Sequence, residues 1–302
     1  MKTYSLIIIS LFIGSVASAQ TFTEKITKEM SFERKGSQNA LMVFNINGDV
    51  KVEGYTGDKI LIEVEKTIIA KTEARLARGK EELQLGIMDR ADTIILYVLG
   101  GCNEFGRKVN SDKSSKWHKG EWNGWGYNWS SHGRDHCDRD VSYDYKLNFT
   151  IKVPSGVNIV ISTVNQGDLE VIGTGASVVA ENVNGDIRLK NISGITRATT
   201  INGSVDINYS GNPSGDSKYY SLNGDINAYF KKGLAAQLTF RSFNGNFYSS
   251  VDEIRPMALT VEKSNKGDGI KYRVNGNRYK VREGGPLLDF ETFNGDVFLR
   301  EQ

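Results

Sequence analysis

Proline, cysteine and long apolar runs are all scarce in this chain. Its 302 residues include 4 prolines and 2 cysteines against 32 glycines, 13 tyrosines and 13 phenylalanines. Little proline with much glycine and many aromatic residues favours short strands joined by tight turns over a helical bundle or a disordered tail. Beyond the first 19 residues no apolar run reaches the roughly 18 residues that a membrane-spanning helix needs, so we predict no transmembrane segment.

An excess of charge of one sign is also missing. Lysine plus arginine number 38 and aspartate plus glutamate number 36, which leaves a formal net charge of +2, or +1 without Lys2. A protein that binds nucleic acid or anionic membranes through general electrostatics carries a clear basic excess. The near balance argues against both kinds of partner.

The first 19 residues have the pattern of an export signal. Lys2 precedes an apolar run at residues 6–13, and Ala17, Ser18 and Ala19 form a small-residue cleavage site. The segment contains no cysteine, so no lipoprotein modification is indicated. We therefore predict a signal peptide over 1–19 and one mature domain over 20–302 that lies outside the cytoplasm, in a periplasm, on the cell surface or secreted.

A short motif, Asn-Gly-Asp or a close variant, recurs seven times. Its copies are Asn47-Gly48-Asp49, Gln166-Gly167-Asp168, Asn184-Gly185-Asp186, Asn202-Gly203-Ser204, Asn223-Gly224-Asp225, Asn244-Gly245-Asn246 and Asn294-Gly295-Asp296. From the second to the sixth copy the glycines are 18, 18, 21 and 21 residues apart. This spacing matches one circuit of a β-solenoid and is too short for a propeller blade.

Each position around these glycines keeps one physical character. Apolar residues dominate at two and four positions after the glycine, and the period of two places both on one buried face of a strand. The residues two after are Val50, Leu169, Ile187, Val205, Ile226, Phe247 and Val297; those four after are Val52, Val171, Leu189, Ile207, Ala228, Ser249 and Leu299. Apolar or aromatic residues also stand two and five positions before the glycine, and small polar residues three before it.

These columns predict an all-β fold, a single-stranded β-solenoid with Asn-Gly-Asp corners over 154–302. In such a corner, Asn-Gly supplies a positive φ and the aspartate accepts hydrogen bonds from its own turn. Stacking of successive circuits then buries a core that no single repeat could bury. The copy at 45–48 indicates that the N-terminal part joins the same wall.

The part before the stack is less regular. Alternation predicts strands over 59–69, 93–99 and 143–153. The segment 72–85 is rich in helix-forming residues and stops at Gly86, so it predicts one short helix that covers an end or side of the stack.

The repeats, the step Val153-Pro154-Ser155-Gly156-Val157 and the closing segment from Gly284 to Val297 resemble the bacterial exported β-solenoid family labelled putative adhesins. The resemblance covers nearly all of the mature chain except residues 100–140. It implies the solenoid fold and a surface role, and it brings no catalytic residues with it.

Residues 100–140 hold both cysteines, all three histidines and all four tryptophans of the chain. If the strands on either side pair as a hairpin, Cys102 and Cys137 meet at the base of its loop, and in an exported protein the default is a disulfide. The alternative is a zinc or copper site, for which His132, His136 and Cys137 joined by His118 or Cys102 offer acceptable ligands. Their spacing matches no specific zinc signature.

The aromatic residues of this insertion permit two interpretations. They could present flat faces to a glycan or another polymer, or they could bury one another as a small core. The residues concerned are Trp117, Trp122, Trp125, Tyr127 and Trp129.

The aspartate column was considered as a source of catalytic acids. It comprises Asp49, Asp168, Asp186, Asp225 and Asp296. A catalytic pair would be an exception to the repeat, with two unequal environments, whereas these residues recur at one corner position. We therefore predict a noncatalytic surface-binding module without a cofactor, whose partner is a surface glycan or a protein. The alternative is a carbohydrate-active enzyme, a polysaccharide hydrolase or lyase, on the same scaffold.

Overall fold

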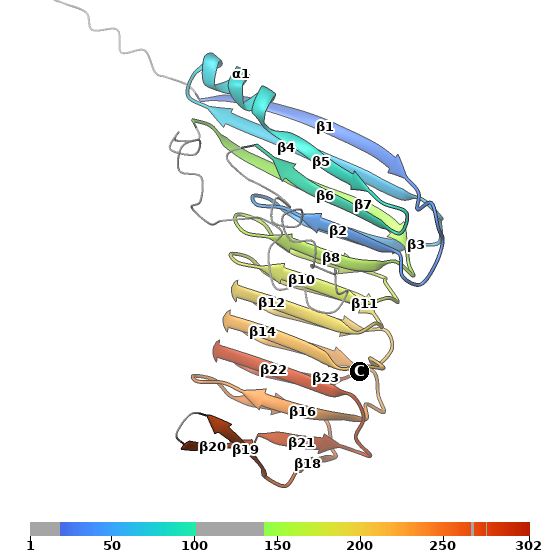
Figure 1. Cartoon of the computed structure of the whole chain (residues 1–302), viewed down its shortest axis with the longest axis vertical. Helices are drawn as coiled ribbons and strands as arrows, with labels where there is room; N and C mark the ends of the chain where they lie inside the picture. The colour runs from blue at the N-terminus through green and yellow to red at the C-terminus, as the bar shows by residue number, and fades with distance from the viewer. Residues whose placement is uncertain (1–18, 101–141, 267–268, 276) are drawn as a thin grey trace, which may run out of the picture.

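The computed structural model describes residues 19–100, 142–266, 269–275 and 277–302 (Figure 1). The chain is mostly β, with two large mixed sheets and, within those residues, one short helix. The strands stack along the long axis of the molecule, and the helix lies at the N-terminal end of the stack. The all-β class is therefore confirmed.

The first sheet, sheet A, has ten strands. In spatial order they are β1 (Gln20–Met30), β4 (Ile60–Ala70), β7 (Asp144–Pro154), β3 (Val50–Tyr55), β9 (Leu169–Ile172), β11 (Ile187–Ile192), β13 (Val205–Tyr209), β15 (Ile226–Phe230), β23 (Val297–Glu301) and β17 (Phe247–Ser249). The strands from β7 to β17 are parallel, while β1 and β4 are antiparallel to their neighbours.

The second sheet, sheet B, has eleven strands. Their spatial order is β18 (Ile254–Pro256), β21 (Arg278–Val281), β16 (Ala236–Arg241), β22 (Leu287–Asn294), β14 (Ser217–Asn223), β12 (Thr196–Asn202), β10 (Val178–Asn182), β8 (Asn158–Thr163), β2 (Ala40–Phe44), β6 (Thr93–Leu99) and β5 (Gln84–Asp89). A separate antiparallel pair, β19 (Thr260–Lys266) and β20 (Gly269–Asn275), follows β18 in the chain.

Each sequence repeat contributes one strand to each sheet, joined at its Asn-Gly corner. The equivalent residues of neighbouring repeats pair in register, so that Ile187 lies beside Val205 and Val205 beside Ile226. The same register holds in sheet B, where Ala198 lies between Ala180 and Tyr219. The columns recognised in the sequence are thus rows of neighbours across each sheet.

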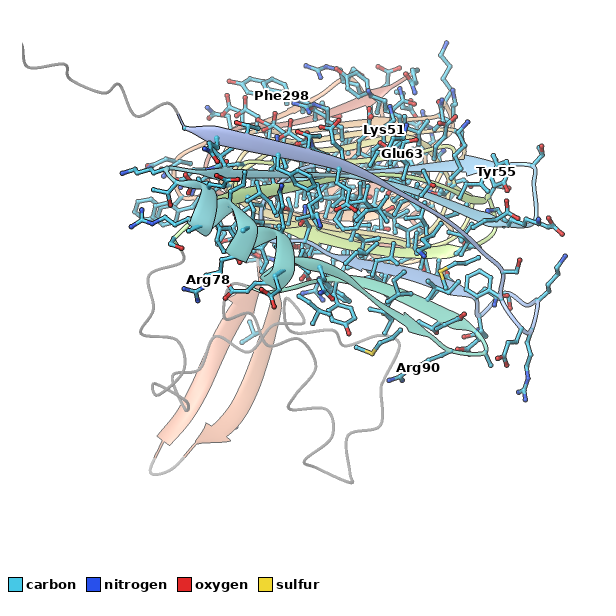
Figure 2. The ribbon with its side chains drawn as sticks, turned by 90° about the horizontal axis from the view of Figure 1, so that it is seen from above. Lys51, Tyr55, Glu63, Arg78, Arg90 and Phe298 are labelled. Atoms are coloured by element: carbon cyan, nitrogen blue, oxygen red, sulfur yellow. The ribbon has the colours of Figure 1, made fainter. Side chains whose placement is uncertain are left out.

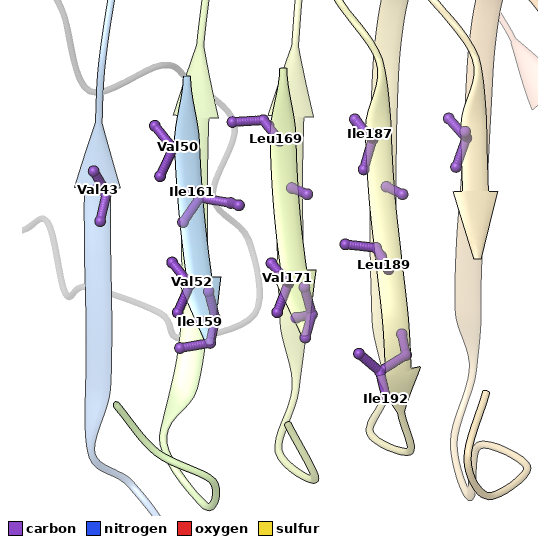
Figure 3. Close-up of a cluster of buried hydrophobic side chains, with 14 of the residues drawn as sticks. Val43, Val50, Val52, Ile159, Ile161, Leu169, Val171, Ile187, Leu189 and Ile192 are labelled. Atoms are coloured by element: carbon purple, nitrogen blue, oxygen red, sulfur yellow. The ribbon is translucent and has the colours of Figure 1, made fainter. Parts of the chain in front are cut away.

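The core lies between the two sheets and consists of the predicted columns. The positions two and four after the glycine are buried in most repeats, and the positions five before it meet them from sheet B (Figure 3). The column ends at the repeat that holds β17, where Phe247 is half-buried and Ser249 is exposed. The predicted inward face is therefore confirmed for the other repeats.

The order of the repeats in space differs from their order in the chain. The last strands, β22 and β23, lie between β14–β15 and β16–β17 (Figure 1). Gly245 consequently faces Gly295 rather than Gly224. The sequence columns did not reveal this spatial order, because the repeats at 224, 245 and 295 carry the same kinds of residue around their glycines.

The N-terminal part agrees with the prediction in outline. The helix α1 (Glu73–Glu82) begins after its N-cap Thr72, whose side chain accepts a hydrogen bond from the Arg75 amide, and it packs on β4 and β1. It ends earlier than predicted, because Gly86 belongs to β5 and lies against the ring of Tyr97. Strand β1 was not predicted. No helix among the described residues is long and apolar enough to cross a membrane.

The hairpin expected at the insertion is wrong. Strand β6 pairs with β2 and β5 in sheet B, whereas β7 pairs with β3 and β4 in sheet A. The two strands that flank the insertion therefore belong to opposite sheets. The alternation of apolar residues predicted each strand correctly but held no information on its partner.

Candidate ligand-binding face

The glycines of the corners are required by the close approach of stacked repeats. A Cβ atom at Gly203 would lie 2.2 Å from the carbonyl oxygen of Gly185, and one at Gly185 would lie 2.1 Å from that of Gly167. Among the seven corner glycines only Gly48, Gly224 and Gly295 have a positive φ. The predicted reason for glycine, a positive φ in each corner, is therefore wrong for the other four.

The aspartates of the corners connect one repeat to the next. The Asp168 Oδ1 atom accepts a hydrogen bond from the Asp186 amide at 2.9 Å, and the Asp186 Oδ1 atom accepts one from the Ser204 amide at 2.8 Å. Asp225 and Asp296 do the same for the repeat that follows each in space. The prediction that the aspartate accepts from its own turn is thus corrected: its partner is the neighbouring corner.

The asparagines form a second ladder beside the aspartates. The side-chain amide of Asn202 donates to the Asn184 Oδ1 atom at 2.8 Å, and that of Asn223 donates to Asn202 at 2.8 Å. Buried hydroxyls complete the corner, since Thr200 donates to the Gly185 carbonyl at 2.9 Å and Ser221 to the Gly203 carbonyl at 2.8 Å. These recurring contacts give the aspartate column a structural role.

The outer face of sheet A divides into two regions. Towards the N-terminus it carries ion pairs, with Glu170 held by Lys190 at 2.7 Å and by Lys51 at 3.0 Å. The hydrogen bond from Lys190 is the main cause that lowers the pKa of Glu170. A shallow hollow of about 590 Å3 lies across β1, β4 and β7 and is lined by charged residues that include Lys28 and Glu63. Within this region Lys25 pairs with Glu63 at 2.6 Å, as the two lysines pair with Glu170.

Towards the other end of the same face the ion pairs give way to aromatic rings. The rings of Tyr248 and Phe298 are stacked, with their centroids 5.1 Å apart and their planes 11° apart. The Arg300 guanidinium lies 4.8 Å from the centre of the Phe298 ring and 5.2 Å from that of Tyr229. We refer to Tyr229, Tyr248, Phe298 and Arg300 as the aromatic patch; Phe298 marks its face in Figure 2.

Neighbouring strands place these four side chains. Tyr248 on β17 lies beside Phe298 on β23, and Tyr229 on β15 lies beside Arg300 on β23. All four belong to the strand positions that alternate with the buried columns, so they point outward, and 48% of the Tyr248 surface is exposed. Hydrogen bonds fix the guanidinium, whose Nη1 atom donates to the Tyr229 hydroxyl at 2.9 Å and to the Asn227 Oδ1 atom at 3.3 Å.

A groove of about 360 Å3 joins the aromatic patch at Tyr229. Arg188, Asp206 and Asn208 are among the residues that line it. Arg188 is already neutralised, since its two terminal nitrogens bind Asp168 at 2.7 Å and Asp186 at 2.6 Å. The groove and the patch together place flat rings, amides and a guanidinium on one open face.

Sheet B carries a second exposed aromatic pair. Phe243 and Phe293 are 74% and 44% exposed and are stacked with their ring centres 4.9 Å apart. Both rings stand two positions before the corner glycine, and at this position they lie on the outer side of the sheet. On the same sheet Glu181 is buried, and burial raises its pKa; the Arg197 Nε atom lies 4.0 Å from its carboxylate.

The predicted site residues of the insertion all belong to the segment 101–141. Trp117, Trp122, Trp125, Tyr127 and Trp129 lie outside the described residues, as do Cys102, Cys137, His118, His132 and His136. Within the described ranges no group of three or more metal-ligating side chains is found. The aromatic patch was not identified from the sequence, although aromatic residues at the outward positions three and five after the glycine were a usable signal.

No family model matches the chain, and no curated protein matches it. Two solved structures are similar. One is named "putative cell adhesion protein" and comes from Clostridium sporogenes ATCC 15579; it is 10% identical, with 93% of this chain and 100% of that chain covered and a TM-score of 0.37. The other is named "putative adhesin" and comes from Bacteroides fragilis NCTC 9343; it is 10% identical, with 92% and 97% covered and a TM-score of 0.27.

Proposed function

We propose that residues 20–302 form a noncatalytic β-solenoid that acts outside the cytoplasm as an adhesin-like module and binds a surface glycan or a protein. The parallel, in-register pairing of equivalent repeat residues supports the solenoid. The export signal predicted over residues 1–19 supports the location.

The observation that carries the binding role is the aromatic patch. Exposed aromatic stacks are disfavoured on a soluble surface unless they serve a contact. Aromatic rings also offer large contact areas at a small cost in side-chain entropy. Tyr248 and Phe298 form such a surface on a rigid sheet, and the Tyr229 hydroxyl and Arg300 supply polar contacts beside it.

A glycan array of the purified protein tests the proposal, with the double variant Tyr248→Ala/Phe298→Ala beside the wild type. We expect the variant to lose binding with an unchanged melting temperature. Phe243→Ala/Phe293→Ala removes the stacked pair of the opposite sheet and decides which of the two exposed pairs binds: we expect it to bind as the wild type does, and loss of binding in this variant alone would assign the ligand to sheet B. Equal binding by the wild type and the patch variant contradicts the proposal for this face.

The alternative function is a carbohydrate-active enzyme. A turnover assay on each glycan that binds separates the two, because a binding module leaves the polymer intact. If product forms, an aspartate of the corner column is the first candidate, and loss of turnover in Asp186→Asn without loss of stability would favour the enzyme. The hydrogen bonds of Asp186 to the next corner support the binding module instead.

The aromatic insertion is a second candidate for the binding surface. Residues 117–129 place four tryptophans and a tyrosine among glycine, asparagine, lysine and glutamate, a mixture that can supply both stacking faces and polar contacts. Shortening residues 112–131 while Cys102 and Cys137 are retained tests it. Loss of binding with an intact melting transition supports the insertion as the ligand site, whereas loss of folding supports the small-core interpretation.

We also propose a disulfide between Cys102 and Cys137. Because the flanking strands do not form a hairpin, the extracytoplasmic location and the even cysteine count are its only support. Peptide mapping without reductant decides it. If both thiols react freely in the exported protein, bound zinc or copper that disappears when His132 and His136 are replaced would support the metal site.

A further inference from the structure

Arg300 is the charged group of the aromatic patch, and no carboxylate of the described residues neutralises it. Within the described part of the chain Arg300 makes no ion pair, whereas Arg188 on the same face binds two aspartates and Arg241 on sheet B binds Asp289 and Glu291. Asp206 lies two strands away from Arg300, on β13, and accepts a hydrogen bond from the Asn227 amide at 2.9 Å. The patch therefore presents one uncompensated positive charge.

The guanidinium is also oriented for a ligand. Both of its hydrogen bonds to protein use the Nη1 atom, and the rings of Phe298 and Tyr229 flank it. Nε and Nη2 have no hydrogen-bond acceptor among the described residues. A planar guanidinium whose remaining N–H groups form a fork is suited to a carboxylate, which it binds with two parallel hydrogen bonds.

We infer that the aromatic patch binds a polymer of carboxylate-bearing sugars, with one sugar ring on the Tyr248–Phe298 stack and its carboxylate on Arg300. This inference rests on the proposed function and narrows its ligand class. A sugar ring can stack on the flat surface of the two aromatic rings, whereas specific recognition of a peptide side chain needs a pocket. The open groove at Tyr229 continues the surface along the sheet and accommodates further residues of an extended polymer.

The test uses paired polymers in which methyl esterification removes the carboxylate charge: polygalacturonate, alginate and hyaluronan, each beside its methyl ester. We expect the wild type to bind at least one acidic polymer at least about tenfold more tightly than its ester, and added salt to weaken that binding. Arg300→Gln should lose roughly tenfold or more of the affinity for the acid and keep the affinity for the ester. Arg300→Lys retains the charge and should keep part of the affinity.

Arg241→Gln is the matched control, since it removes an arginine from the opposite sheet, and its affinity should equal that of the wild type. Equal binding of acid and ester, or an unchanged affinity in a folded Arg300→Gln variant, overturns the inference. Binding of poly-glutamate in place of all three acidic polymers overturns it as well. If a neutral glycan binds through Tyr248 and Phe298 and no acidic polymer does, the inference fails while the proposed function stands; if replacing these rings changes no binding, the proposed function fails for this face.

Discussion

The corners and the aromatic patch are built on the same strands, yet their residues are used in opposite ways. At the corners, similar side chains recur in each repeat and bind their own neighbours, as Asp168, Asp186 and Asn202 do. In the patch, Tyr248, Phe298 and Arg300 occupy outward positions that are mostly charged or polar in the preceding repeats, and Nε and Nη2 of Arg300 have no acceptor among the described residues. Side chains that recur in each repeat and bind one another stabilise the fold. Side chains that depart from the repeat and keep unused hydrogen-bonding groups indicate a contact surface.

The largest loss of stability is expected from a substitution in the core between the two sheets. Ile207 is 1% exposed and lies between Leu189 and Ala228. An Asp residue there would bury an unpaired carboxylate, and we expect Ile207→Asp to abolish cooperative unfolding, a loss of several kcal/mol. Circular dichroism during urea denaturation measures it. Asn208→Asp, at the adjacent outward position, is the control and should unfold as the wild type does; equal stability of the two variants would refute the register.

The second-largest loss of stability is expected from a substitution that disturbs the close approach of stacked corners. In Gly203→Ala the new Cβ atom would meet the Gly185 carbonyl oxygen at 2.2 Å, so the strands must separate, at a cost of about 2–3 kcal/mol. Gly211→Ala is the matched control, since its Cβ atom would lie 3.5 Å from the nearest heavy atom, on Ser193. Chemical denaturation of both variants compares them. A stable Gly203→Ala variant would show that the corners can open without loss.

A smaller effect tests the hydrogen bonds between corners. Asp186→Ala removes the acceptor of the Ser204 amide and one partner of Arg188, and we expect a loss of about 1 kcal/mol of unfolding free energy. Asp186→Asn keeps an acceptor oxygen and should lose less. Thermal unfolding of the two variants ranks them. Identical stabilities would mean that the aspartate column contributes no hydrogen-bond energy.

The smallest loss of stability at neutral pH is expected at Glu301, at the end of strand β23. Arg282 binds both carboxylate oxygens of Glu301, which lowers the pKa of Glu301 below its usual value of 4.5. Because the folded pKa is the lower one, the pair stabilises the fold above pH 4.5, and this contribution is lost as the pH falls through the folded pKa. Glu301→Gln should therefore melt lower than the wild type at pH 7 and approach it at acid pH.

Melting temperatures between pH 7 and acid pH measure this convergence. Glu283→Gln is the control, since the Glu283 side chain is almost fully exposed, and its melting temperature should follow that of the wild type throughout. A gap between Glu301→Gln and the wild type that stays constant with pH would show that the ionised pair is not its cause.

The sequence predicted the core well and the strand order poorly, and the reason is physical. Burial depends on the character of each column, so Ile187 and Val205 were recognised as inward residues from periodicity alone. Pairing depends on which repeat lies next in space, and the repeats at 245 and 295 present similar columns to the repeat at 224. Periodicity therefore could not detect that β22 and β23 insert ahead of β16 and β17.

The candidate site was hidden for a related reason. Tyr229, Tyr248 and Phe298 are far apart in the chain and meet only because β23 lies between β15 and β17. The change from charged to aromatic residues along that face becomes visible once the strands are placed. The unpaired state of Arg300 depends on its neighbours in space, which the sequence alone does not supply.

One paired measurement tests the central claim that the corners maintain the fold while the patch binds. Binding of a glycan selected on the array and the melting temperature are measured together for Tyr248→Ala/Phe298→Ala and for Asp186→Ala. The account predicts that the patch variant loses binding and keeps its melting temperature, whereas the corner variant melts lower and still binds. The reverse pattern, with binding lost at Asp186 and kept without Tyr248 and Phe298, would contradict it.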